Sequence, residues 1–199
     1  MKSLVLAGLA APFLAMGAPA SFEVRGAEVE ARRSGDAAEV RVVYDLTVID
    51  AACGWFLAEI DGLPAGEREP KAALVLDGKE FPAAVEESRG GRAVQAFRES
   101  REEGARALGA AKSVRLVLTF PKAPCTGPEF TVPVLLPKPE YWREEGKERQ
   151  KGFPRLTVRF DAEGEAASAE IRATFRTVPG GARVVLRSDP LSAGVSILK

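Results

Sequence analysis

Residues 39–49 read Glu-Val-Arg-Val-Val-Tyr-Asp-Leu-Thr-Val-Ile, and this alternation decides how the chain folds. Val40, Val42, Tyr44, Leu46 and Val48 share one parity, and polar side chains occupy most of the other. Successive side chains of a β-strand point to opposite faces of the sheet, so one face of this segment belongs to a core. The stretch therefore predicts a half-buried antiparallel strand.

Turn and bulge signals surround this strand. Apolar residues change parity between positions 22–24 and 29–31, so a β-bulge is expected at Gly26-Ala27. Ser34-Gly35-Asp36 predicts the turn that leads into the long strand, and Asp77-Gly78 predicts a two-residue hairpin. Further alternating segments follow at 114–120 and 130–136, where Pro133 has the outward parity of an edge strand.

Residues 92–109 differ from the rest because they are rich in Ala, Arg, Glu and Gln. Val94, Phe97, Ala105 and Leu108 can share one helical face, so a short helix is expected here.

Many short strands separated by turn signals predict an all-β protein. Residues 21–138 have the length of one immunoglobulin-like or fibronectin-III-like antiparallel β-sandwich. Residues 139–152 are polar and indicate a charged linker or long loop, and residues 153–199 are expected to add a four-stranded β unit packed against the sandwich. In that unit Gly180-Gly181 would close a hairpin that pairs Phe175 with Leu186 and Arg172 with Asp189.

The first twenty residues have the features of a signal peptide. Lys2 is followed by an apolar stretch and then by Ala18-Pro19-Ala20, so cleavage is expected before Ser21. The apolar stretch is too short to span a bilayer comfortably, which disfavours a membrane anchor. The mature chain is thus expected to be periplasmic or extracellular, without a membrane span.

The expected export determines the redox state expected for the two cysteines. Cys53 and Cys125 are the only cysteines, and in an oxidising compartment they are expected to form a disulfide. A disulfide closing the loop between Cys53 and Cys125, which are 72 positions apart, would stabilise the fold by roughly 4 kcal/mol. A redox or metal-binding thiol is the alternative, which the lack of a C-x-x-C motif and of His disfavours.

Composition excludes several classes of function. The chain has no His, which removes Ser-His-Asp and Cys-His catalysis and every His-ligated metal site. Its 28 basic and 28 acidic residues balance, so net charge gives no reason to expect nucleic acid as a partner. The absence of Asn is typical of proteins from hot environments, or equally of a GC-rich genome.

No catalytic motif is found, so no enzyme activity, cofactor or metal is expected. A hydrolase built on two facing carboxylates remains an alternative, because 28 acidic residues could supply such a pair.

The C-terminal region carries one patterned charge feature. Its six arginines have the parity opposite to the apolar residues, so they are expected to share one sheet face: Arg155, Arg159, Arg172, Arg176, Arg183 and Arg187. Such a face could bind acidic polysaccharide, lipopolysaccharide phosphates or DNA. The simpler interpretation is a solvated face with local ion pairs.

Tyr141 and Trp142 are adjacent aromatic residues in the charged stretch. They could contact a sugar or a partner protein, or they could pin the linker to the sandwich.

These observations give three hypotheses. The first is an exported, non-enzymatic β-sandwich that acts as a binding or assembly module of the cell envelope, with an envelope protein as partner. The second is a binder of acidic polymers through the arginine face. The third is the carboxylate-pair hydrolase.

Overall fold

The computed structural model describes residues 18–88, 91–125, 127–139, 152–176 and 182–197. Within these ranges the protein is mostly β, with one short helix, α1 (Arg101–Ala110), and a single 3-10 turn, η1 (Gly66–Arg68). The broad prediction of a β-rich fold is therefore confirmed. In this part of the chain no helix has the length and apolar content needed to cross a bilayer.

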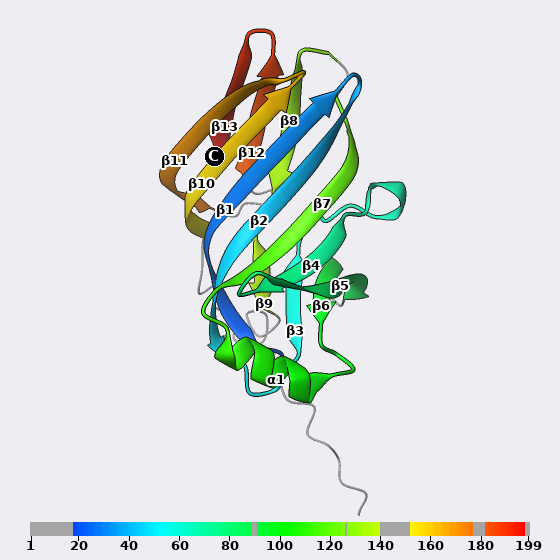
Figure 1. Cartoon of the computed structure of the whole chain (residues 1–199), viewed down its shortest axis with the longest axis vertical. Helices are drawn as coiled ribbons and strands as arrows, with labels where there is room; N and C mark the ends of the chain where they lie inside the picture. Colours follow the sequence, from blue (N-terminus) through cyan, green and yellow to red (C-terminus); the bar gives the residue numbers. More distant parts are fainter. Residues whose placement is uncertain (1–17, 89–90, 126, 140–151, 177–181, 198–199) are drawn as a thin grey trace, which may run out of the picture.

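The strands form two sheets (Figure 1). The larger is strongly curled, like half a barrel, and its order is β11 (Glu165–Arg176), β10 (Gly152–Ala162), β1 (Ser21–Ser34), β2 (Ala37–Asp50), β7 (Val114–Pro124), β4 (Lys71–Leu76), β5 (Lys79–Ser88), β6 (Gly91–Ala96), β3 (Phe56–Ile60) and β9 (Pro137–Pro139). The smaller is antiparallel, with the order β13 (Leu191–Ile197), β12 (Ala182–Ser188) and β8 (Glu129–Val134).

This architecture corrects the expected antiparallel sandwich with an additional four-stranded C-terminal unit packed against it. β10 runs parallel to β1, from Leu156 opposite Ala27 to Ala162 opposite Arg33, so the large sheet is mixed. The C-terminal strands divide between the sheets, because β10 and β11 extend the large sheet while β12 and β13 join β8. The physical reason is that the edge of β1 not used by β2 is free to pair with β10.

The expected pairing of β11 with β12 is wrong for the same reason. The described partner of β11 is β10, and Leu186 lies opposite Phe130 of β8 and Ala193 of β13. Gly180 and Gly181 lie outside the described residues.

Most local predictions are confirmed. The register of β1 against β2 shifts between Val24 and Gly26, which leaves Arg25 as the extra residue of a bulge. The β4–β5 hairpin turns at Asp77 and Gly78, whose φ angles of 49° and 85° are those of a two-residue turn with the twist that hairpins need. β8 is an edge strand of the small sheet, as Pro133 indicated.

The helix expected over 92–109 is confirmed only in its second half. α1 covers 101–110, whereas 91–96 forms β6 between β5 and β3. Val94 is buried in β6, so its helical spacing with Leu108 of α1 arises from two separate elements.

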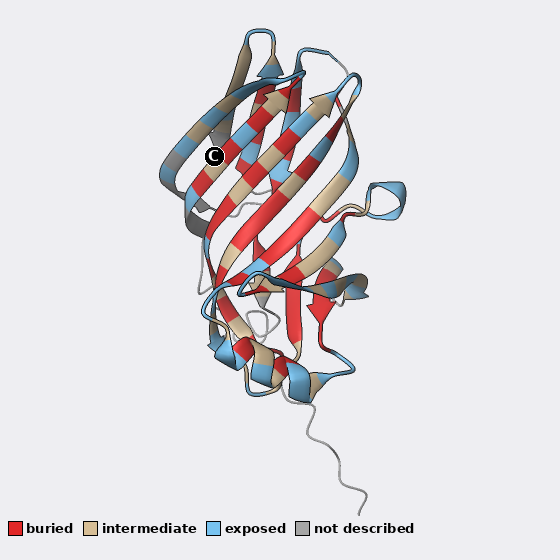
Figure 2. Ribbon diagram, viewed as in Figure 1, coloured by how far each residue is buried: buried red, intermediate tan, exposed pale blue. Residues whose placement is uncertain are grey.

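The core lies between the concave face of the curled sheet and the small sheet. Figure 2 shows buried segments alternating with intermediate or exposed ones along most of β1, β2 and β10, as expected of strands with one face toward a core. Phe130 of β8 meets Phe160 of β10 edge to face, with ring centroids 5.6 Å apart, and so joins the two sheets. Toward α1, Phe22 stacks on Phe56 at 5.2 Å.

α1 closes one end of the molecule through an unusually close backbone contact (Figure 1). A Cβ atom on Gly104 would lie 1.9 Å from the carbonyl oxygen of Gly54, and one on Gly54 would lie 1.7 Å from that of Arg101. Both positions therefore require glycine. Leu108 is the large apolar side chain that α1 buries.

Residues 1–17 and 140–151 lie outside the described residues, so the signal-peptide cleavage and the linker stay predictions. Ala20 belongs to the folded part, where its N–H donates to the carbonyl oxygen of Trp55 at 2.7 Å.

Candidate functional site

The six arginines predicted to share a face are divided by the fold. Arg155 and Arg159 on β10 and Arg172 on β11 point outward from the large sheet, because the intervening Leu156 and Val158 are fully buried. Arg183 and Arg187 lie on the exposed side of β12, which belongs to the small sheet. The side chain of Arg176 lies outside the described residues. The single arginine face is therefore wrong, since it assumed that β11 and β12 pair.

Most of these arginines already have carboxylate partners. Arg159 lies 3.2 Å from Glu28 and 3.8 Å from Glu30, both on the neighbouring β1. Arg172 contacts Glu170 at 2.8 Å, and Arg187 contacts Glu129 at 2.6 Å. A guanidinium already bonded to a carboxylate must give up that partner to hold an incoming anion, so local pairing weakens the case for an anion-binding face.

Arg155 reaches its partner across a whole strand. Its Nη2 lies 3.3 Å from Asp45 Oδ2 on β2, although β1 runs between the two strands. The residue of β1 at the crossing is Gly26, where a Cβ would stand 3.3 Å from the carbonyl oxygen and 3.4 Å from Nε of Arg155. Asp45 also accepts a bond from Arg115 Nε at 3.0 Å, so one carboxylate joins three strands.

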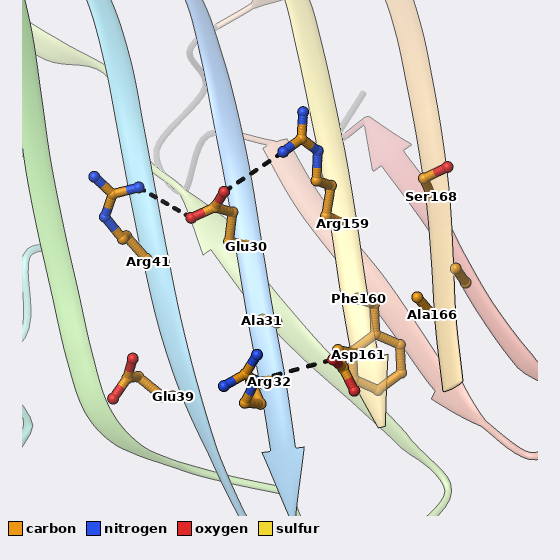
Figure 3. A pocket seen from close by; sticks show the side chains of 11 residues that line it. Glu30, Ala31, Arg32, Glu39, Arg41, Arg159, Phe160, Asp161, Ala166 and Ser168 are labelled. Atoms are coloured by element: carbon orange, nitrogen blue, oxygen red, sulfur yellow. Dashed lines mark hydrogen bonds and ion pairs between the residues drawn. The ribbon is translucent and has the colours of Figure 1, made fainter. Parts of the chain in front are cut away.

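A shallow charged groove of about 590 Å³ lies on the outward face of β2, β1, β10 and β11 (Figure 3). We call it the charged groove. Glu30 stands at its centre between Arg41, at 2.9 Å, and Arg159. Beside them Arg32 faces Asp161 at 3.9 Å, and Ser168 of β11 closes the far side.

The charged groove gives no support to the carboxylate-pair hydrolase. That reaction uses two carboxyl groups that face one another. Glu30 instead lies between two guanidinium groups, and Asp161 faces a third. Among the described residues no group of three or more Cys, Asp or Glu side chains is placed to hold a metal ion.

The expected disulfide is not formed, and the fold explains why. Both cysteines are free, and they lie at opposite ends of β2. The N–H of Cys125 donates to the carbonyl oxygen of Asp36, just before β2, whereas Cys53 follows the end of β2. A strand of 14 residues spans roughly 45 Å, several times the distance that a disulfide can bridge.

Cys125 and Tyr44 are buried groups whose pKa values are raised. Burial raises the pKa of the Cys125 thiol, an effect that nearby Arg33 partly offsets. Burial also raises the pKa of the Tyr44 phenol well above its ordinary range, while a hydrogen bond with the backbone of Leu135 lowers it slightly.

The aromatic candidates give no site in the described structure. Trp55 packs beneath Arg101 of α1, whose guanidinium carbon lies 5.5 Å from the centroid of the indole ring. Tyr141 and Trp142 lie outside the described residues, so their role stays a prediction.

A second groove, which we call the apolar groove, opens between β7 and β8. The two strands are consecutive in the chain but do not pair, because β7 pairs with β2 and β4 and β8 pairs with β12. β4 begins at Lys71 opposite Thr119, so β7 continues for five residues in which one edge has no strand partner within the described part of the chain. The space between the two edges has a volume of about 310 Å³.

Apolar side chains form the walls of the apolar groove, and charged ones lie at its rim. Phe120 and Ala123 of β7 are half-buried there, and buried core residues add further apolar lining: Val40, Phe130, Val132 and Leu135. Glu67 and Arg68 come from the loop that carries η1, which projects beside β7, and Lys122 comes from β7 itself (Figure 1).

The rim cations differ from the arginines of the large sheet. Arg68 and Lys122 are exposed, and within the described ranges neither forms an ion pair. A sequence signal for this groove existed in Pro133 and Pro121, prolines inside strand-like segments, which indicate edges. Alternation alone could not show that the two edges face one another.

Comparisons with known proteins leave the family open. No protein-family model and no curated protein sequence matches the chain. Among solved structures, yeast LTA4 hydrolase in complex with bestatin matches with a TM-score of 0.41 and 9% identity, over 78% of this chain and 26% of that one. Native leukotriene A4 hydrolase from Saccharomyces cerevisiae matches with a TM-score of 0.42 and 8% identity, over 87% of this chain and 30% of that one. The chain thus spans under a third of the length of these proteins.

Proposed function

We propose that this chain is a non-enzymatic binding module exported to the cell envelope, and that it holds its ligand in the apolar groove. The supporting observation is the opening between β7 and β8, where apolar side chains line a space beside two strand edges that have no strand partner there among the described residues. Ligand sites are concave and mostly apolar with a few polar groups, and a volume of about 310 Å³ lies at the lower end of their range.

The charged groove is the weaker candidate for a binding surface. It is larger, but its arginines face carboxylates of this same chain. Exposed ion pairs of this kind contribute about 0–1 kcal/mol each and need no ligand to explain them.

Two matched variants test which groove binds. Thr131 is exposed at the apolar groove and Ser168 is exposed at the charged groove, so Thr131→Trp and Ser168→Trp each place one bulky side chain over one of them. The tagged native chain and both variants would be cross-linked in source cells, and the captured proteins and lipids analysed by mass spectrometry.

We expect a component that is captured with the native chain and with Ser168→Trp but lost with Thr131→Trp. A component lost only with Ser168→Trp would assign the function to the charged groove. Identical recovery with all three chains would contradict the proposal.

Export has its own test. Sequencing of the amino terminus of the chain recovered from the envelope or medium is expected to begin at Ser21. An intact Met1 in the cytoplasmic fraction would contradict the export part of the proposal.

A further inference from the structure

The edges of the apolar groove are poorly suited to an added β-strand. Pro121 lies on the β7 edge and Pro133 on the β8 edge, and proline has no N–H to donate. A peptide backbone placed there would leave polar groups facing proline and apolar side chains, which costs free energy. An occupant without a hydrogen-bonding backbone avoids this cost.

The lining of the groove indicates what its occupant can be. Phe120 and Leu135 are among the apolar side chains that line this space of about 310 Å³. One alkyl chain lying between β7 and β8 would contact both side chains and remove apolar surface from water.

The rim supplies the charge complementarity. Arg68 and Lys122 come from two different elements and both line the same groove, and neither has a carboxylate partner within the described ranges. Glu67 lies at the rim as well, so the local excess is one positive charge. An anionic head group would complete two charge-assisted contacts that the chain itself leaves open.

We propose that the apolar groove binds a single-chain anionic amphiphile of the fatty-acid class, with its alkyl chain between β7 and β8 and its carboxylate at Arg68 and Lys122. This inference rests on the proposed function, because it names the ligand class for the same groove. The alkyl chain contributes binding through apolar area removed from water, and the head group fixes its direction.

The experiment is calorimetric titration of the purified chain with decanoate, with decanol as the uncharged counterpart and acetate as the head group without a chain. We expect saturable binding of one decanoate per chain and no saturable binding of acetate at a hundredfold higher concentration. Arg68→Gln and Lys122→Gln should each weaken decanoate binding about fivefold to tenfold and leave decanol unchanged. Glu67→Gln should strengthen decanoate binding about twofold.

Two controls separate these effects from general damage. Lys112→Gln removes an exposed lysine that does not line the groove and should leave decanoate binding unchanged. Thr131→Trp should abolish binding of decanoate and decanol alike, and Ala123→Leu, which fills the groove from the opposite strand, gives the same test if Thr131→Trp fails to fold.

Unsaturable decanoate binding, or binding that neither Arg68→Gln nor Thr131→Trp changes, would overturn the proposal that the groove binds a fatty-acid-like amphiphile. If decanoate fails but a captured protein is still lost with Thr131→Trp, the groove holds a protein segment, and the proposed function survives without this inference. If neither decanoate binding nor the capture of any component is changed by Thr131→Trp, the proposed function and the fatty-acid ligand are both wrong.

Discussion

Arg155 of β10 and Asp45 of β2 form an ion pair at 3.3 Å although a whole strand separates them. The pair exists because Gly26 leaves the surface of β1 low enough for the guanidinium to pass over it. The glycine of the bulge thus has a role beyond the change of parity, since it lets the parallel strand β10 bond to the second strand along the sheet.

Substitution of Gly26 by Val should therefore destabilise the protein by about 1–3 kcal/mol, because the new side chain must displace the backbone and side chain of Arg155. Gly194→Val is the matched control, since a Cβ there meets only the carbonyl oxygen of Val185 at 3.9 Å. Urea unfolding of both variants measures the difference. Equal stabilities would show that Arg155 moves aside at no cost.

Two glycines of α1 should respond in opposite ways to alanine. Gly104→Ala forces apart the contact with Gly54 and should cost about 3 kcal/mol. Gly109 has open space around its Cβ position, so Gly109→Ala should stabilise the protein by about 0.5–1 kcal/mol through helix propensity. Thermal unfolding of the two variants should shift the midpoint in opposite directions, and a shift of the same sign would argue against the close contact.

The cysteines should behave as two separate thiols. Titration of the denatured, unreduced chain is expected to give two thiols, and the native chain should react faster at Cys53 because Cys125 is fully buried and its pKa is raised. Cys53→Ser should cost less than about 1 kcal/mol, well below the loss expected from breaking a disulfide. A mass two daltons lower with no reactive thiol would contradict the fold.

Tyr44 should make stability fall in alkali. Its pKa is raised in the folded state, so between the ordinary value near 10 and the folded value the unfolded chain loses a proton that the folded chain keeps. The contribution is complete below about pH 10, and above it the free energy of unfolding should fall by up to about 1.4 kcal/mol per pH unit. Urea unfolding between pH 9 and 12 should show a shallower decline for Tyr44→Phe, and parallel curves would refute this assignment.

Local chemistry made part of this structure predictable. The bulge near Gly26, the turn at Gly35 and the hairpin at Asp77-Gly78 each depend on residues within a few positions of one another. Their backbone preferences act over the same short range, so they could be read without the rest of the fold.

Pairing between distant segments could not be predicted in this way. The period-two alternation indicates that Leu156, Val158 and Phe160 face a core. It does not show whether their strand pairs with β1 or with β12. The single arginine face depended on that missing information. The disulfide depended on how β2 and β7 pair, which places Cys53 and Cys125 at opposite ends of β2. The apolar groove was hidden for the same reason, because it exists only where β7 and β8 diverge.

The parallel pairing of β1 with β10 has a consequence for how the chain is made. Ala27 of β1 lies opposite Leu156 of β10, which is synthesised almost 130 residues later. One edge of β1 therefore stays uncovered until β10 has been made. Until then an incomplete sheet exposes an edge that neighbouring nascent chains could pair with. Contacts so distant in sequence also slow folding. Efficient production of this protein should therefore depend on a holding factor that keeps the early strands apart until the last quarter of the chain has emerged.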